Sequence, residues 1–289
     1  MEEQLQELKE ELQERNALLR TEYAREQKRR KLAEQNRLFD LLHVTMKPQH
    51  PNIVEFTVTG DYGLFSDPVM RIGGEKCSYQ IPTYEALKGI LHSVYWKPTI
   101  IWYIDEVRVM NRIQTEVKGI RPIKYVGGGN DLAYYTYLKD CCYQVRAHFE
   151  FNDNRPELEQ DRNENKHHNI ALRCIERGGR RDVFLGAREC QGYVEPCRFG
   201  EGAGAYDELP ELSFGVMYHG ITYADEACTE ETRGKMTANF WRPVMKNGVV
   251  RFPRPEDCPM HKTLRDGIIK PFGEKQQNFI GLREFGEVE

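Results

Sequence analysis

The spacing of apolar residues along the chain predicts three long strands. Val54, Phe56 and Val58 alternate with polar residues, a period of two that is typical of a strand with one buried face. Residues 100–109 form a mainly apolar run, which predicts a buried strand. Residues 144–151 alternate again, and this predicted strand follows three consecutive glycines.

Two other segments have the period of an amphipathic helix. The first begins after Thr83, a suitable N-cap, and is closed by Pro98. Its predicted apolar face consists of Tyr84, Leu87, Ile90, Leu91 and Val94. The second has apolar residues over 170–175 and stops at Gly178-Gly179, because consecutive glycines end a helix readily.

A short apolar segment at 183–185 completes the order β-α-β-β-α-β. This order predicts an α+β protein with a ferredoxin-like domain, the arrangement also used by RNA-recognition domains. We expect that domain to span residues 46–190 and a C-terminal β-sheet domain with a tail to span 191–289.

The C-terminal segment carries strand and turn signals only. Residues 214–223 predict one strand. Lys246-Asn247-Gly248 predicts a hairpin turn between strands at 240–244 and 249–252, because Asn-Gly favours the two-residue turn of a hairpin.

Residues 1–45 predict a charged helical extension, since they contain neither glycine nor proline. The first leucines fit a heptad repeat, but Arg15, Glu22 and Glu26 interrupt it. We therefore expect a solvated appendage rather than a coiled-coil partner, and a chain that starts at Met46 should still fold and act.

Composition narrows the class of protein. The net charge is -4, so a nucleic-acid partner would need locally clustered Lys and Arg rather than a basic chain. The eight cysteines form no CxxC pair, which favours a reduced cytoplasmic protein without structural zinc. No apolar stretch is long enough to predict a membrane span. The sequence has no GxSxG, P-loop or HExxH motif.

The candidate chemistry lies at three places. In the segment 161–168, Lys166 and His167 would lie near a helix N-terminus, where a phosphate binds readily; the alternative is a solvated polar loop. Residues 95–98, Tyr-Trp-Lys-Pro, could stack bases and hold phosphate, or could simply pack in the core. Residues 177–181, with Arg188, place arginines around two glycines, as a backbone-binding turn or a helix C-cap would.

Taken in order, these motifs resemble the CRISPR-associated Cas-five family, specifically its type I-C branch (subtype d), from about residue 53 to the mid-250s. The stretches that carry the resemblance include Gly60–Phe65, Pro82–Ile90, Tyr95–Thr99, Tyr135–Asp140, His148–Phe151, Asp161–His167, Leu185–Tyr193 and Phe252–Pro259. Residues 1–45 lie outside them.

The resemblance implies an endoribonuclease that processes CRISPR repeat RNA without metal or cofactor. The 2′-hydroxyl attacks the adjacent phosphorus and leaves a 2′,3′-cyclic phosphate and a 5′-hydroxyl. The implied catalytic residues are Tyr95, Lys166 and His167, and the expected RNA-binding residues are Lys97, Arg162, Arg180, Arg181 and Arg188. The implied partners are repeat and guide RNA, other subunits of the type I-C surveillance complex and, through that complex, target DNA.

Two other functions remain open from the sequence. The chain could cap the guide RNA as a structural subunit without cutting it. It could also be a metal-dependent nuclease with Asp161, Glu164 and His167 as ligands, although their spacing matches no established site.

Overall fold

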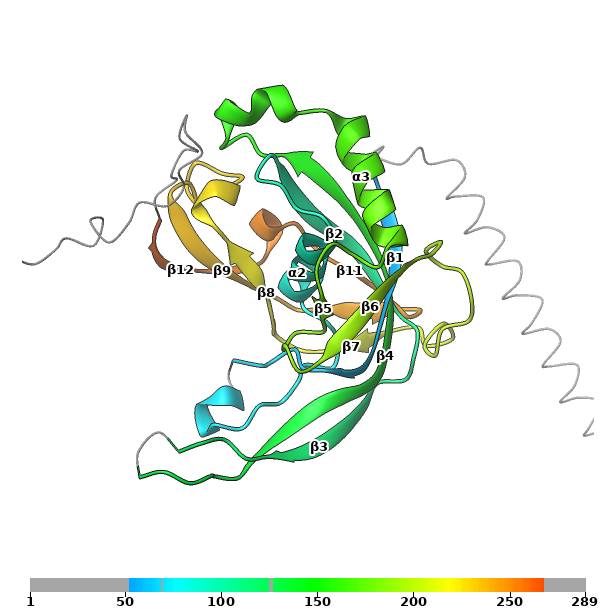
Figure 1. Ribbon diagram of the computed structural model, residues 1–289, viewed down its shortest axis with the longest axis vertical. Coiled ribbons are helices and arrows are strands. Elements are labelled where there is room, and N and C mark those ends of the chain that lie inside the picture. The colour runs from blue at the N-terminus through cyan, green and yellow to red at the C-terminus, as the bar shows by residue number, and fades with distance from the viewer. Residues whose placement is uncertain (1–51, 69, 125–126, 268–289) are drawn as a thin grey trace, which may run out of the picture. The chain divides into compact units, whose positions relative to one another are not determined.

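A computed structural model describes residues 52–68, 70–124 and 127–267 (Figure 1). The predicted extension over residues 1–45 lies outside them. The helices are α2 (Tyr84–Val94) and α3 (Glu164–Glu176), with short 3-10 helices η1 (Met70–Gly73), η2 (Pro156–Asp161), η3 (Ala224–Glu226) and η4 (Pro255–Asp257). The strands are β1 (Val54–Gly63), β2 (Ile100–Val109), β3 (Gln114–Ile120), β4 (Ala133–Phe151), β5 (Val183–Phe184), β6 (Gln191–Pro196), β7 (Leu212–Ser213), β8 (Met217–Thr222), β9 (Lys235–Trp241), β10 (Val244–Lys246), β11 (Val249–Arg251) and β12 (Met260–Asp266).

Two antiparallel sheets with few helices make up the described fold, so the predicted mixture of α and β structure is confirmed. The larger sheet has the order β5-β6-β1-β4-β2-β11-β10-β7, and β3 pairs with the first half of β4. The smaller sheet has the order β12-β9-β8. Strands from both sides of residue 190 therefore share the larger sheet, and the domain boundary expected there stays a prediction.

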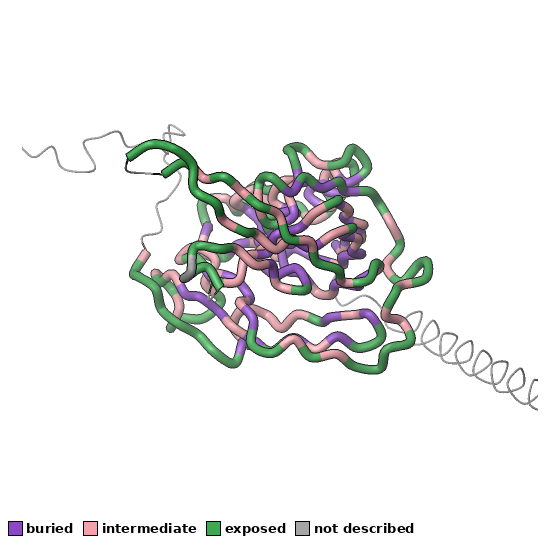
Figure 2. Tube along the Cα trace, turned by 90° about the horizontal axis from the view of Figure 1, so that it is seen from below, coloured by how far each residue is buried: buried purple, intermediate pink, exposed green. Residues whose placement is uncertain are grey.

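The alternating segments fold as predicted because each has one face to bury. Val54, Phe56 and Val58 of β1 are fully buried, whereas the residues between them are half-buried. Phe56 pairs with Val145 of β4 in the antiparallel register. Each such side chain contributes about 1.5–3 kcal/mol through burial. Figure 2 shows buried residues gathered in the interior of the described chain, with exposed residues around them.

Helix α2 begins after Thr83, as predicted, and ends at Val94, the last residue of its predicted apolar face, rather than at Pro98. The Thr83 hydroxyl accepts a hydrogen bond from the backbone N–H of Ala86, at 3.2 Å. One face of α2 packs on β2, and another contacts β8 of the smaller sheet, so the helix lies between the two sheets (Figure 1). On that second side, buried Lys88 forms an ion pair with Glu226, and Glu85 accepts a hydrogen bond from the Ile221 N–H at 3.1 Å.

The strand expected at 183–185 is short, and the neighbour of β1 is a later strand. Residues Val183–Phe184 form β5, which pairs with β6, and β6 in turn pairs with β1. The sequence placed β6 in the C-terminal part. Its alternation over only six residues was too brief to distinguish from the all-β segment that follows.

Two other predictions need correction. The connection after β2 contains β3, which pairs with β4 to form an arm that projects from the body, with Gly127-Gly128-Gly129 near its tip (Figure 1). The strand expected at 240–244 is two strands, because Phe240 pairs within the smaller sheet and Val244 within the larger, on either side of Pro243. The hairpin turn itself is confirmed, with φ of 50° at Asn247 and 81° at Gly248.

No helix among the described residues is long and apolar enough to cross a membrane. All eight cysteines lie in the described part of the chain, and none of them forms a disulfide there.

Candidate active site

The two predicted catalytic segments meet where α2 ends and α3 begins. Tyr95 follows the last residue of α2 in an extended conformation, and its N–H still donates to the Leu91 carbonyl at 2.7 Å. Its own carbonyl accepts from the indole N–H of Trp102 at 2.8 Å. With its backbone held on both sides, Tyr95 directs its hydroxyl to Nδ1 of His167, 2.7 Å away.

The other ring nitrogen of His167 fixes the tautomer of the imidazole. Nε2 lies 2.8 Å from the backbone carbonyl oxygen of Asp161, and a carbonyl can only accept. Nε2 therefore carries the hydrogen, and the Tyr95 hydroxyl donates to the lone pair of Nδ1 in the neutral ring. The ring packs edge-on against Phe149 and Phe151 and is fully buried.

Burial also sets the protonation states of this pair. It lowers the pKa of His167 from 6.5, and the positive charge of Lys166 lowers that pKa further, although the carbonyl and carboxylate of Asp161 oppose the shift. Burial raises the pKa of Tyr95 to about 12, with the Asp161 charge adding to the rise. At neutral pH the pair therefore consists of a neutral phenol and a neutral imidazole.

Asp161, the last residue of η2, joins the remaining groups of the site. Its carboxylate accepts from Lys166, from Lys97 at 3.2 Å and from the hydroxyl of buried Thr99 at 2.8 Å. Partial burial alone would raise the pKa of Asp161, but these hydrogen bonds outweigh it and lower the pKa well below 3.8. The carboxylate is therefore ionised and balances one of the two ammonium groups.

At the start of α3, where the sequence predicts a phosphate-binding helix N-terminus, one backbone N–H already has a partner. The N-cap residue of α3 is Asn163, whose side-chain oxygen already accepts from the N–H of Lys166 at 3.0 Å. The exposed cations here are the side chains of Lys166 and Lys97, which are 45% and 40% exposed. The neighbouring His168 holds the Ile53 carbonyl at 3.0 Å and so anchors α3 to the start of β1.

The predicted RNA-binding arginines lie at several places. The N–H groups of Arg180 and Arg181 both donate to the Ser93 carbonyl, which places this turn beside the end of α2. The Arg180 charge partly offsets the burial that raises the pKa of Tyr95. Both side chains are exposed. The guanidinium of Arg162 contacts the Asn152 carbonyl at 2.9 Å and Asp153 at 3.1 Å. Arg188 is exposed in the turn between β5 and β6. This turn follows Leu185, which bonds Leu64 just after β1 ends, whereas His168 of the site bonds Ile53 just before β1 begins.

The structure thus brings together Tyr95, His167, Lys166, Lys97 and Arg180, with Arg181 beside them. It does not bring Arg188 to this cluster, and it holds Arg162 in contacts with its own loop. The sequence did not single out Thr99 as a site residue, nor Asp161 as the shared acceptor. The available signal was the position of Thr99 two residues after Lys97.

The donor set does not suit a metal ion. Both ring nitrogens of His167 are engaged, and the carboxylate of Asp161 is held by two ammonium groups and a hydroxyl. Glu164, the third residue of that hypothesis, accepts from the Asn52 amide at 2.8 Å. Within the described ranges, no three His, Cys, Asp or Glu side chains gather in a metal-binding group.

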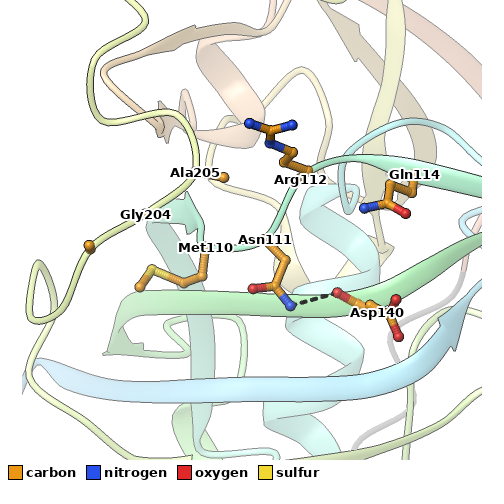
Figure 3. A pocket seen from close by; sticks show the side chains of 8 residues that line it. Met110, Asn111, Arg112, Gln114, Asp140, Gly204 and Ala205 are labelled. Atoms are coloured by element: carbon orange, nitrogen blue, oxygen red, sulfur yellow. Dashed lines mark hydrogen bonds between the residues drawn. The ribbon is translucent and has the colours of Figure 1, made fainter.

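A separate pocket of about 460 Å³ lies at the base of the arm, where β2 leads into β3 (Figure 3). Polar side chains of Asn111, Arg112, Gln114 and Asp140 line it beside Gly204. The Asn111 amide donates to the Asp140 carbonyl at 2.8 Å. The pocket lining holds no hydrogen-bonded pair comparable to Tyr95 and His167.

Comparison with known proteins points to one family. The family model that matches residues 53–253 is described as a CRISPR-associated protein. A CRISPR pre-crRNA endoribonuclease Cas5d of Mannheimia succiniciproducens is 28% identical over 233 residues, 70% of this chain and 95% of the relative. Its namesake from Thermus thermophilus is 24% identical over 246 residues, 78% of this chain and 94% of the relative.

A solved structure agrees with these relatives. The crystal structure of a CRISPR-associated protein is 34% identical to this chain, with a TM-score of 0.61 over 73% of this chain and 96% of that one. The resemblance predicted from the sequence is confirmed, since the family model covers more than half of the residues. The chain therefore belongs to the CRISPR-associated Cas5d family.

Proposed function

We propose that this chain is a metal-independent endoribonuclease that cuts CRISPR precursor RNA at a hairpin in the repeat and then stays on the 5′ handle as a surveillance-complex subunit. The observation that carries the proposal is the Tyr95–His167 hydrogen bond beside two lysines. The names of the two curated relatives, both pre-crRNA endoribonucleases, support the substrate.

We also propose that the central strands form a ferredoxin-like domain. Strands β6-β1-β4-β2 are neighbours in that order, each antiparallel to the next, with α2 after β1 and α3 after β4. A split β-α-β unit, in which a third strand lies between the first two, has this connectivity. The site then lies where both helices reach the same end of the sheet.

The protonation states favour a proton relay for the first half of the reaction. A phenol with a pKa of about 12 is ionised in only about one molecule in 10⁵ at pH 7, so Tyr95 is a poor base by itself. As the 2′-hydroxyl attacks phosphorus, its proton passes to the Tyr95 oxygen while the Tyr95 proton passes to Nδ1 of His167. The resulting imidazolium is stabilised by the backbone carbonyl of Asp161, which accepts from Nε2.

The second half needs a positive charge and a proton donor. The ammonium of Lys166 balances the charge on the phosphorane and gives its proton to the departing 5′ oxygen. The O2′–P bond forms and the P–O5′ bond breaks, which leaves a 2′,3′-cyclic phosphate and a 5′-hydroxyl. Arg180 and Arg181 hold the RNA backbone beside the site, because exposed guanidinium groups bind phosphate oxygens.

The decisive experiment incubates the purified protein with repeat RNA from the host's CRISPR locus, with and without EDTA. Cleavage at one position in both conditions, with 2′,3′-cyclic phosphate ends, is the expected result. RNA that binds but stays intact would instead identify a non-cutting cap on the guide. Cleavage that EDTA abolishes would contradict the metal-independent reaction.

A further inference from the structure

The carboxylate of Asp161 has an environment that a phosphate group would also suit. Two ammonium groups and one hydroxyl converge on its oxygens: Lys97 at 3.2 Å, Thr99 at 2.8 Å and Lys166. A phosphate carries the same kind of acceptor oxygens and accepts charge-assisted hydrogen bonds from the same donors. These three donors form the phosphate seat. They come from two segments, the turn between α2 and β2 and the first turn of α3, which only the fold brings together.

The same carboxylate lies on the solvent side of the Tyr95–His167 pair. Tyr95 is 1% exposed and His167 is fully buried, whereas Asp161 retains 23% exposure of its side chain. Of Tyr95, His167 and Asp161, only Asp161 therefore faces solvent, as the two lysine side chains do. Thr99 is only 2% exposed, and its hydroxyl contacts the Asp161 carboxylate.

The backbone of Asp161 has a separate role from its side chain. Its carbonyl oxygen holds Nε2 of His167 at 2.8 Å. Rotation about the Cα–Cβ bond would withdraw the carboxylate from both lysines and leave that carbonyl in place. The protein can therefore open the seat without disturbing the tautomer of His167.

We propose that the Asp161 carboxylate occupies the seat of the scissile phosphate, and that RNA binds by displacing it from Lys97, Lys166 and Thr99. Asp161 is then a built-in competitor, which neutralises the seat until an RNA that makes its other contacts displaces it. Thr99 becomes a donor to the bound phosphate. This inference rests on the proposed function, because it takes the site as the place of RNA cleavage.

The test compares RNA affinity between wild type and Asp161→Asn, which removes the charge and keeps the backbone carbonyl. The probe is the repeat RNA with 2′-deoxyribose at the mapped cleavage position, so that it binds and stays intact. We expect Asp161→Asn to bind about tenfold more tightly, because two partly exposed ion pairs no longer have to be broken. We also expect the slope of log affinity against log salt to steepen by about one, because the displaced wild-type carboxylate takes up a counterion and the asparagine does not.

The matched control is Glu159→Gln, which makes the same change of charge in the same 3-10 helix at an exposed residue that contacts neither lysine. Its affinity should stay near that of the wild type. Equal or weaker binding by Asp161→Asn, in a protein that melts normally, would overturn the proposal and leave Asp161 as a structural anchor of the lysines.

A second variant keeps the test decisive if Asp161→Asn does not fold. Lys97→Met should weaken RNA binding about tenfold and reduce the salt slope by about one, because Lys97 would lose its phosphate. Unchanged affinity and slope in Lys97→Met would contradict the seat. The two proposals also fail separately: if unsubstituted RNA stays intact, the cleavage function fails, and the same affinities measured on that RNA still test the exchange.

Discussion

The Tyr95–His167 hydrogen bond is best tested by Tyr95→Phe, which removes one oxygen from a buried pair. In the variant, Nδ1 of His167 keeps its lone pair but loses the donor at 2.7 Å, and Nε2 remains on the Asp161 carbonyl. A buried acceptor left without a donor costs about 1–3 kcal/mol of folding free energy. A loss of about 2 kcal/mol in a chain of this size lowers the melting temperature by about 4–8 °C.

The effect on cleavage should be much larger than the effect on RNA binding. Without the hydroxyl, the proton of the 2′-oxygen has no path to His167, and loss of general base catalysis lowers a rate by about 10²–10⁴-fold. Affinity should stay within about threefold, because the Tyr95 hydroxyl would contribute one hydrogen bond to an RNA whose phosphates are held mainly by lysines and arginines. Single-turnover cleavage of repeat RNA gives the rate constant, and filter binding gives the affinity.

Tyr103→Phe is the matched control. Tyr103, on β2, is buried like Tyr95. Its hydroxyl contacts the thiol of Cys228 at 3.3 Å. Its loss should cost stability without changing the rate constant for cleavage. If Tyr95→Phe cuts RNA within tenfold of the wild-type rate while folded, the relay is wrong, and Tyr95 only packs against His167.

Four further predictions concern the same site. His167→Ala removes the proton acceptor and should abolish cleavage in a gel assay while repeat affinity stays within about threefold; full activity would refute its role. Lys166→Ala should lower the single-turnover rate about a hundredfold and affinity much less, and equal losses would make it a plain phosphate contact. Arg180→Ala with Arg181→Ala should weaken binding and reduce the salt slope by about one to two, with the rate of bound RNA unchanged. Burial lowers the pKa of His167, so its neutral form should persist above pH 6.5. The cleavage rate and the stability that His167 contributes should both fall as the pH drops through a midpoint below 6.5. A midpoint at or above 6.5 in a pH series would contradict this.

The sequence predicts the helices and central strands well because their signals are local. Thr83 and Pro98 bracket α2, and the alternation around Phe56 defines a strand with one buried face. Strand β3 has no such face: its residues alternate only between exposed and half-buried, and its pairing with β4 stabilises it instead. Without a buried face, β3 has no alternating apolar pattern for the sequence to reveal, although its partner is the next strand along the chain.

Some residues of the candidate site could be identified from the sequence, and others only from the folded structure. Tyr95, Lys166 and His167 follow from family motifs, and the structure brings them together. The central position of Asp161 depends on contacts with Lys97 and Thr99, more than sixty positions earlier in the chain, which only the packed sheet creates. Arg162 shows the converse, because its neighbours in the sequence favour RNA binding while the fold gives its guanidinium to Asn152 and Asp153.

The place of α2 between the two sheets affects how variants of this protein should be interpreted. The Lys88–Glu226 ion pair and the Glu85–Ile221 hydrogen bond brace the helix from the side that carries no proposed catalytic group. Tyr95 directly follows that helix, so a small rotation of α2 would move its hydroxyl away from His167. Substitutions in the β8–η3 segment would therefore misalign the proposed catalytic pair while every proposed RNA contact stays intact. A chain that ends before β8 would keep the candidate catalytic residues but lose this brace, together with β10 and β11, which extend the larger sheet from β2.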